Sequence, residues 1–275
     1  MSREFSVVIS VYAKDDPVHF GIAIDSLLKQ TLLPSEIIVA VDGPINGGLL
    51  DKVNQYSRLP ILSVLRLPKN IGLGASRHKA ILRAKSEIIA VMDSDDISTE
   101  NRFELQLEKF NADNVDIVGG FIAEFSESPD LIKSIREVPL SHEDIIKRGR
   151  WKQPINHVTL MFRKEAYFLS GGYRSFRKIE DYDLFHRMVM AGLTFLNLPE
   201  VIVKVRASDD QYARRHGVAY LWEELILFRG MHRTGYIGHF NFLFNIIIRF
   251  FARLMPLAAL RFLSKRFLRS SFLAS

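Results

Sequence analysis

Short apolar runs alternate with amphipathic segments along most of the chain. Runs of six to eight mostly apolar residues that end at polar or turn-forming residues are typical of buried strands, and they occur at 5–12, 36–41, 61–67 and 87–92. Between them the pattern predicts helices at 15–29, 49–56 and, after a loop, within 72–84. Strands that alternate with short helices predict βαβ units, in which a parallel sheet is covered on both faces.

The second half continues with a looser alternation. It predicts further helices and strands, the helices at 101–110, 142–149 and 180–192 and the strands at 117–124, 158–162 and 201–205. No internal repeat and no linker is evident before about residue 206. We therefore expect one α/β domain over residues 1–215 and a helical, basic C-terminal region over residues 216–275.

The composition is that of a folded chain without cysteine chemistry. Its 275 residues suffice for a large core. A charged fraction of 25% together with an aromatic fraction of 11% excludes a disordered chain. The absence of Cys excludes disulfides, Cys-ligated zinc, iron–sulfur clusters and a thiol nucleophile. No Gly-x-Gly-x-x-Gly follows the first strand, which argues against a nicotinamide dehydrogenase.

The net charge of +6 is unevenly distributed. No acidic residue follows Glu224 but eight Lys and Arg do, so that segment carries +8, while the 29 bases and 31 acids of residues 1–224 give −2. A basic segment points to nucleic acid or anionic lipid. Because these bases are interleaved with long aliphatic side chains, and not with stacking aromatics on a polar sheet, we expect no nucleic-acid partner.

The basic C-terminal region has the pattern of amphipathic helices. Between Arg233 and Arg249 there are only 15 uncharged residues, fewer than the ~20 that a membrane-spanning helix needs. Bases then recur four residues apart, as at Arg249 and Arg253, and so share helix faces. We interpret the region as two amphipathic helices, broken near Pro256, that lie in the interface of an anionic membrane. Packing on the α/β domain and an oligomer interface are the alternatives.

Three carboxylates follow the fourth predicted strand. Asp93, Asp95 and Asp96 come directly after an apolar run, and ligands of open α/β sheets bind at the carboxyl ends of strands. Alternate residues of an extended segment face the same way, so Asp93 and Asp95 can converge on one cation, and Mg²⁺ prefers such oxygen ligands. The alternative is a cluster that caps the next helix, which Asp96 and Ser98 precede.

Several short motifs occur in the order found in one enzyme family. They are Ser6-Val-Val-Ile-Ser-Val-Tyr, Ile38-Val-Ala-Val-Asp42-Gly43, Asn70-Ile-Gly72-Leu-Gly74-Ala-Ser-Arg77, Asp93-Ser-Asp95-Asp96, Asn156-His157-Val-Thr159, Gly171-Gly172-Tyr173 and Glu180-Asp181-Tyr-Asp183. Each is weak alone, but the ordered set is specific, and over residues 5–206 the chain resembles the family 2 glycosyltransferases. The resemblance implies the GT-A fold, an α/β fold with a Rossmann-like, mostly parallel central sheet and helices on both faces.

The resemblance implies roles for the acidic motifs. Asp42 is expected to contact the nucleotide, with the base as its partner, although Asp-Gly-Pro is also a turn signature. Asp93 and Asp95 become the metal–diphosphate motif for Mn²⁺ or Mg²⁺, with Asp95 as direct ligand and Asp93 on the ribose or a metal-bound water. Asp181 becomes the general base for the acceptor hydroxyl, and Glu180 binds or orients the acceptor. Acids that simply favour a helix N-terminus are the alternative for this pair.

Further basic and loop residues are implied on the nucleotide side. Asn70, Gly72 and Arg77 belong to a loop before a helix, and by resemblance this loop approaches the ribose or diphosphate. Guanidinium groups suit diphosphate oxygens, which makes Arg206 and Arg214 candidates for the same ligand.

Four residues are candidates with strong alternatives. Trp151, His157 and Gly172 are assigned to the donor sugar or the acceptor, but a core Trp and a structural His are equally compatible with the sequence. His216 is a candidate metal ligand, the alternative being a solvated basic loop.

Together these features predict an inverting, metal-dependent glycosyltransferase. We expect it to move a sugar from a nucleoside diphosphate sugar, with UDP as the default nucleotide, to a lipid-linked saccharide. The expected pathway is bacterial surface polysaccharide synthesis (O-antigen, capsule or exopolysaccharide). The expected location is cytoplasmic, peripheral on the inner face of the cell membrane. A non-catalytic relative is disfavoured because the acidic motifs are intact.

Overall fold

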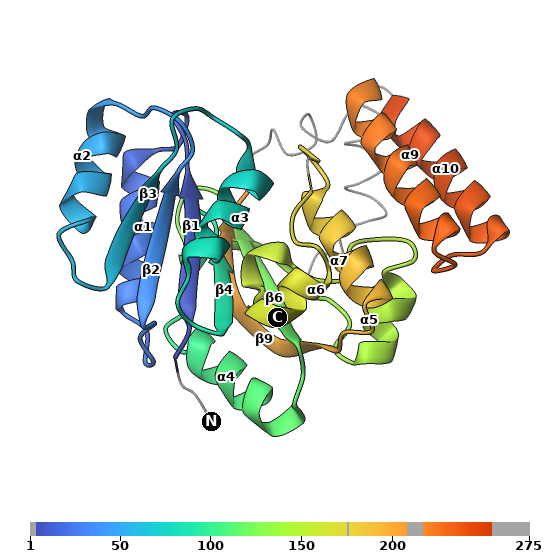
Figure 1. Ribbon diagram of the computed structural model, residues 1–275, viewed down its shortest axis with the longest axis horizontal. Coiled ribbons are helices and arrows are strands. Elements are labelled where there is room, and N and C mark those ends of the chain that lie inside the picture. The colour runs from blue at the N-terminus through green and yellow to red at the C-terminus, as the bar shows by residue number, and fades with distance from the viewer. Residues whose placement is uncertain (1–3, 175, 208–216, 255–275) are drawn as a thin grey trace.

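A sheet of nine strands runs through the part of the chain that the structure, a computed structural model, describes: residues 4–174, 176–207 and 217–254 (Figure 1). The spatial order is β3-β2-β1-β4-β8-β6-β9-β5, with β7 paired to β6. The strands are β1 (Ser6–Val11), β2 (Glu36–Val41), β3 (Leu62–Arg66), β4 (Ile88–Met92), β5 (Ile97–Ser98), β6 (Ile117–Phe125), β7 (Ile132–Arg136), β8 (Met161–Arg163) and β9 (Phe195–Arg206).

Most strands point the same way. Strand β1 pairs parallel with β2 and β4, β2 pairs parallel with β3, and β6 pairs parallel with β9. Strand β8 runs antiparallel between β4 and β6, and the two short strands β5 and β7 are also antiparallel to their partners. The expected mostly parallel sheet is therefore confirmed.

Helices cover both faces of the sheet, as expected. One face packs against α1 (Pro17–Leu28), α2 (Gly47–Tyr56) and α4 (Arg102–Asp113). The other packs against α3 (Leu73–Arg83), α5 (His142–Arg148), α6 (Lys164–Leu169), α7 (Glu180–Met190) and α9 (Val218–Arg233). The last described helix, α10 (His239–Leu254), lies beside α9 in a hairpin at the edge of the molecule (Figure 1).

Local sequence explains the first βαβ unit. All of β1 is buried, and its alternate residues Val7 and Ile9 reach one core while Val8 reaches the other. Asp16 caps α1, because its Oδ1 accepts hydrogen bonds from the amides of Val18 (2.8 Å) and His19 (3.0 Å).

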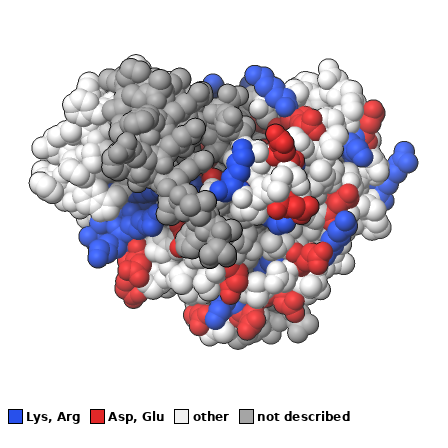
Figure 2. Space-filling view, turned by 180° about the vertical axis from the view of Figure 1, so that it is seen from behind, with Lys and Arg blue, Asp and Glu red and all other residues white. Residues whose placement is uncertain are grey.

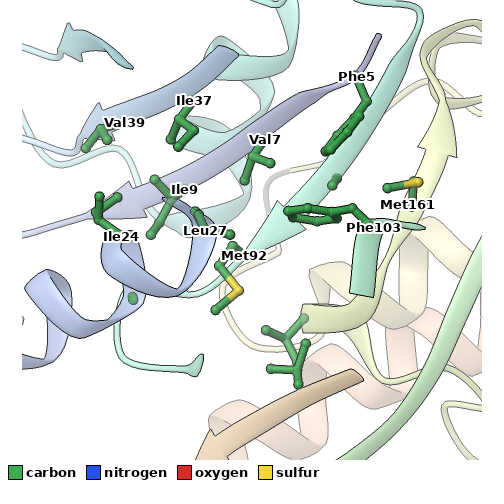
Figure 3. Packing of buried hydrophobic residues seen from close by; sticks show 14 of the residues in the cluster. Phe5, Val7, Ile9, Ile24, Leu27, Ile37, Val39, Met92, Phe103 and Met161 are labelled. Atoms are coloured by element: carbon green, nitrogen blue, oxygen red, sulfur yellow. The ribbon is translucent and has the colours of Figure 1, made fainter. Parts of the chain in front are cut away.

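The first core lies between the sheet and α1, α2 and α4. Figure 3 shows Val7 and Ile9 of β1 beside Ile24 and Leu27 of α1, with Phe103 of α4 close to Phe5. The rings of Phe5 and Phe103 are 4.7 Å apart and tilted. This core fixes the first four strands, at whose carboxyl ends the acidic motifs lie.

The second core extends into the C-terminal region. Leu227, Phe228 and Met231 of α9 belong to the same buried cluster as Tyr182 and Phe185 of α7. The boundary that we placed between residues 215 and 216 lies within a segment outside the described residues. The described part of the basic region is thus joined to the α/β domain by a shared core.

Some elements differ from the sequence pattern. The expected strand at 158–162 begins as a 3₁₀ turn, His157–Thr159, because Thr159 Oγ1 donates to the Asn156 carbonyl and accepts from the Gly120 amide. The late strand at 201–205 is longer, spanning all of β9. The second amphipathic helix expected after Pro256 lies outside the described residues.

Candidate functional site

Asp42, Asn70 and Gly72 meet beyond the end of β2. The buried carboxylate of Asp42 accepts hydrogen bonds from the amides of Ile71 (2.7 Å, Oδ1) and Gly72 (2.9 Å, Oδ2). The amide side chain of Asn70 donates to the Asp42 carbonyl at 3.2 Å. Gly43 has φ 88°, and a Cβ there would lie 2.6 Å from the Asn70 amide. The turn and the loop before α3 are therefore one rigid unit.

Arg77 and Asp93 form an ion pair between α3 and the end of β4. Arg77 is only 2% exposed, and its Nη2 contacts Oδ1 of Asp93. The Nε of Arg77 is buried and has no hydrogen-bond partner in the structure. A buried guanidinium at this edge of the sheet is a suitable partner for phosphate oxygens.

The other acids of the β4 motif lie in different surroundings. Asp95 is exposed, whereas Asp96 is buried and accepts a hydrogen bond from the Arg206 amide at 2.9 Å. Burial, and secondly the charge of Asp95, raise the pKa of Asp96 to about 8. Burial also raises the pKa of Asp15 to about 6, and that carboxylate accepts from Ser94 Oγ at 2.9 Å. Crowded acids of this kind are common at functional sites.

The acids at this edge fit a cation that is shared with a phosphate ligand. Among the described residues no three acids or histidines gather as a complete metal site. Asp93 and Asp95 supply hard oxygen atoms, and Mg²⁺ usually takes one or two carboxylates and completes its shell with water and substrate phosphates. The predicted ligand His216 and the predicted diphosphate contact Arg214 lie outside the described residues.

Arg206 lies beside the acidic motif but outside the cavity described below. Its contact with the acidic motif is made by its backbone amide, to Asp96. Its guanidinium carbon lies 4.7 Å from the centre of the Phe125 ring, and its Nε is buried without a partner. In this structure the guanidinium packs on an aromatic ring and is not among the groups that line the cavity described below.

Glu180 and Asp181 begin α7 next to the loop that precedes α3. A Cβ on Gly74 would lie 3.4 Å from the Cβ and Cγ of Glu180, so the two segments are in close contact. Asp181 Oδ1 accepts from the Tyr182 amide at 2.8 Å. Burial, and secondly Asp181, raise the pKa of Glu180 to about 7, and Glu180 Oε2 is buried without a hydrogen-bond partner. The pair thus contains one carboxyl that readily holds a proton near neutral pH.

His157 is fixed beside these acids by an aromatic side chain. Its Nε2 lies 2.8 Å from Oη of Tyr173, and the two rings meet edge to face. Burial, and secondly the charge of Arg77, hold the pKa of His157 well below its usual value. A neutral imidazole here can position a hydroxyl but does not add positive charge.

Several of these groups line a cavity of about 380 Å³. Among them are Arg77, Asp93, His157, Glu180 and Asp181, which the sequence analysis assigned to the site, whereas Asp42, Asn70, Gly72 and Asp95 are not lining residues. The lining also includes residues that the sequence analysis did not assign to the site: Lys152, Lys178, Tyr220, Glu224, Arg249 and Arg253. The only signals for them were the four-residue spacing of the two arginines and the position of Glu224 as the last acid.

Trp151 and Gly172 do not line this cavity. Trp151 packs edge-on against Phe244 of α10, with ring centres 5.5 Å apart. Gly172 has φ 61°, and a Cβ there would lie 2.8 Å from the Tyr167 ring and hydroxyl. Trp151 thus packs on α10 and Gly172 lies against Tyr167, and neither is a lining residue of the cavity.

Known proteins resemble the chain along nearly its whole length. A sequence model described as "Glycosyl transferase family 2" matches residues 6–178. The chain is 35% identical to the amylovoran biosynthesis glycosyltransferase AmsE of Erwinia amylovora, over 95% of this chain and 98% of that protein. It is 31% identical to the UDP-Gal:alpha-D-GlcNAc-diphosphoundecaprenol beta-1,3-galactosyltransferase of Escherichia coli, over 97% of each.

A solved structure has the same architecture. S. aureus TarS 1-349 in complex with UDP-GlcNAc matches with a TM-score of 0.69 at 16% identity, over 90% of this chain and 73% of that one. Likeness at such low identity concerns the fold, and it confirms the GT-A fold expected from the motifs.

Proposed function

The chain belongs to glycosyl transferase family 2, and on this premise we propose that it is an inverting, cation-dependent glycosyltransferase. It transfers a sugar from a UDP-sugar to a hydroxyl group of a lipid-linked saccharide. The product is a building block of a bacterial surface polysaccharide such as O-antigen, capsule or exopolysaccharide.

The observation that carries the proposal is the meeting of Arg77, Asp93 and Asp181 in one cavity. Asp181 takes the proton of the acceptor hydroxyl as that oxygen attacks the anomeric carbon. The bond from this carbon to the diphosphate breaks, and the diphosphate leaves with the bonding electrons near Arg77. A single displacement inverts the configuration at the anomeric carbon.

The proposed cofactor is Mn²⁺ or Mg²⁺. Asp95, which is exposed, and Asp93 would hold it. Such a cation would neutralise charge on the diphosphate as it departs. A chelator should therefore abolish transfer, and added Mn²⁺ or Mg²⁺ should restore it.

Two relatives support the choice of donor and acceptor. TarS was solved with UDP-GlcNAc, and the E. coli relative is named for UDP-Gal and for a GlcNAc-diphosphoundecaprenol acceptor. A uridine diphosphate donor and an acceptor sugar joined to lipid by a diphosphate are therefore proposed for this chain.

The proposed location is the inner face of the cell membrane, with the chain bound peripherally. Among the described helices, none has both the length and the apolarity to cross a bilayer. One side of α10 nevertheless exposes a row of apolar side chains, namely Phe240, Leu243, Phe244, Ile247 and Phe251. Figure 2, which shows the molecule from behind, is mostly white on the side of α9 and α10 above a cluster of blue side chains. An apolar face on an acid-free, basic segment suits anionic lipid.

The direct test is a donor panel with a diphosphate-lipid acceptor. The purified chain would be mixed with UDP-, GDP- and dTDP-sugars, with and without a chelator, and the product linkage determined by NMR. We expect transfer from one UDP-sugar, dependent on a divalent cation and with inverted anomeric configuration. Retained configuration, or activity that survives complete chelation, would contradict the mechanism.

A further inference from the structure

The hairpin of α9 and α10 presents a fixed, positively charged surface to the cavity. Arg253 makes a two-point ion pair with Glu224, with Nε and Nη2 each 2.8 Å from a carboxylate oxygen. Arg249 Nε lies 3.3 Å from the same carboxylate. Two guanidinium groups therefore share one carboxylate, which leaves one positive charge in excess.

These arginines are held rigidly. The guanidinium carbon of Arg249 lies 4.0 Å from the centre of the Phe228 ring, and that of Arg253 lies 4.6 Å from the Tyr220 ring. Arg249 also donates to Asn245 Oδ1 and to the Trp151 carbonyl, both at 2.6 Å. Guanidinium groups that are already positioned lose little conformational entropy when they bind a ligand.

The cavity is lined by acids and bases from different elements. Asp93, Glu180 and Asp181, from the end of β4 and the start of α7, line it where the donor diphosphate and the base are proposed to act. Arg249 and Arg253 of α10 line the same cavity, together with Lys152 and Lys178. The acids suit a cation and a base, and the guanidinium groups of α10 suit an anion.

The hairpin lies on the side of the molecule away from β2. In Figure 1, β2 (which Asp42 follows), β4, α7 and the hairpin of α9 and α10 are placed in this order from left to right. Asp181 begins α7, between the two sides. A ligand group bound at the hairpin would therefore belong to the acceptor and not to the UDP-sugar.

We propose that the α9–α10 hairpin binds the diphosphate that joins the acceptor sugar to its lipid, through Arg249, Arg253, Lys152 and Lys178. This inference rests on the proposed function. It also relates the two faces of the hairpin: the inner face binds the phosphates, and the outer apolar face of α10 contacts the membrane that holds the lipid. In this proposal the acceptor sugar lies between the hairpin and Asp181, which line the same cavity.

The test compares two acceptors with the same sugar and the same alkyl chain, one joined through a diphosphate and one a neutral glycoside. Assays in non-ionic detergent exclude lipid headgroups. Lys152→Gln and Lys178→Gln change exposed side chains and so spare the packing of α10. Arg253→Lys keeps the positive charge but removes the planar guanidinium group that makes the two-point contact. Lys147→Gln, exposed on α5 outside this cavity, is the matched control.

We expect the wild-type chain to prefer the diphosphate acceptor. Each cavity variant should raise KM for that acceptor about tenfold, with little change in kcat, in KM for the neutral glycoside or in KM for the donor. The control should match the wild type.

Equal losses on both acceptors would show a structural role and overturn the proposal. A wild-type chain that does not distinguish the two acceptors would overturn it as well. So would an effect that is seen only on anionic vesicles, because it would assign the site to lipid headgroups. Failure of the proposed function is a different result, namely no transfer to either acceptor with any nucleotide sugar.

Discussion

Arg77 of α3 contacts the carboxylate of Asp93, the first acid after β4, although Arg77 is itself almost completely buried. A buried guanidinium needs this partner, because an unpaired charge in the interior is strongly destabilising. The same guanidinium faces the cavity that contains Glu180 and Asp181. The ion pair therefore links the stability of the fold to the proposed diphosphate site.

Replacing Arg77 should affect both properties. We expect Arg77→Gln to lower the free energy of unfolding by about 3 kcal/mol and to weaken UDP binding at least tenfold. Chemical denaturation and calorimetric titration with UDP measure the two effects. Arg83→Gln, exposed on the same helix, is the control and should change neither. Wild-type UDP affinity in a folded Arg77→Gln protein would rule out a role for this guanidinium at the donor.

Asp181→Asn tests the assignment of the base. The amide keeps the size of the side chain but cannot accept the proton, so we expect the transfer rate to fall by about 10²–10⁴-fold. UDP binding and the unfolding midpoint should stay close to wild type, since the donor contacts are left in place. Near wild-type turnover by the purified variant would show that another group removes the proton.

The raised pKa of Glu180 predicts how the stability of the fold depends on pH. Its pKa rises from 4.5 to about 7 on folding, so the folded chain retains a proton that the unfolded chain releases. The stabilisation that the Glu180 proton gives the folded chain is complete below pH 4.5. It decreases as the pH rises to about 7 and is lost above that pH. We expect Glu180→Gln to lack this decrease, which should amount to about 1–3 kcal/mol.

Urea unfolding of both proteins between pH 4.5 and 8 measures the difference. Glu143→Gln, exposed in the first turn of α5, makes the same chemical change elsewhere and should keep the wild-type pH profile. Parallel profiles for wild type and Glu180→Gln would mean that the carboxyl of Glu180 does not titrate in this range.

Features with local causes could be predicted from the sequence. The first buried strand, expected within 5–12, and the first helix, expected within 15–29, depend on neighbouring residues, and both form there. The acids at Asp93 and Asp181 were identified because the family motifs preserve their order along the chain. Parallel strand ends bring Asp42 and Asp93 to one edge of the sheet, whereas Asp181 is positioned by the start of α7.

Features that depend on distant partners could not be predicted. Arg249 and Arg253 fit the pattern of lipid-facing bases, but the structure turns both toward Glu224, which is 25 and 29 positions earlier in the chain. The two-residue strand β5 forms because it pairs with β9, whose Val203 and Lys204 lie far away in sequence. The periodicity of apolar residues within a short stretch of sequence carries no information about such contacts between distant segments.

Adding one methyl group at Gly149 tests how the hairpin of α9 and α10 packs against α7. A Cβ on Gly149 would overlap the ring of Phe185 in α7 and lie 2.5 Å from Oη of Tyr236, in the turn between α9 and α10. We expect Gly149→Ala to destabilise the fold by about 1–3 kcal/mol. Gly230→Ala is the matched control, because a Cβ there meets nothing within 4 Å and Ala favours a helix, so it should stabilise by up to about 1 kcal/mol. Unfolding midpoints that move together in both variants would contradict this account of the attachment.

The exposed face of α10 predicts where the chain meets the membrane. Deleting residues 240–275 would also remove Arg249 and Arg253 from Glu224, so point substitutions are the sharper test. Phe240 and Phe251 are 79% and 62% exposed, and each Phe that enters an apolar phase contributes about 1.5–3 kcal/mol. We expect the double change Phe240→Ser and Phe251→Ser to weaken binding to anionic vesicles at least tenfold, measured by co-sedimentation.

The matched control changes equally exposed apolar residues on other surfaces. Leu131 and Leu169 are 69% and 66% exposed and lie outside α9 and α10. If α10 makes the contact, the double change Leu131→Ser and Leu169→Ser should leave vesicle binding at the wild-type level, because α10, which combines apolar surface with an acid-free basic sequence, is unchanged in that variant. Equal losses in both double variants would indicate non-specific adsorption, and unchanged sedimentation of the α10 variant would remove this face from the membrane contact.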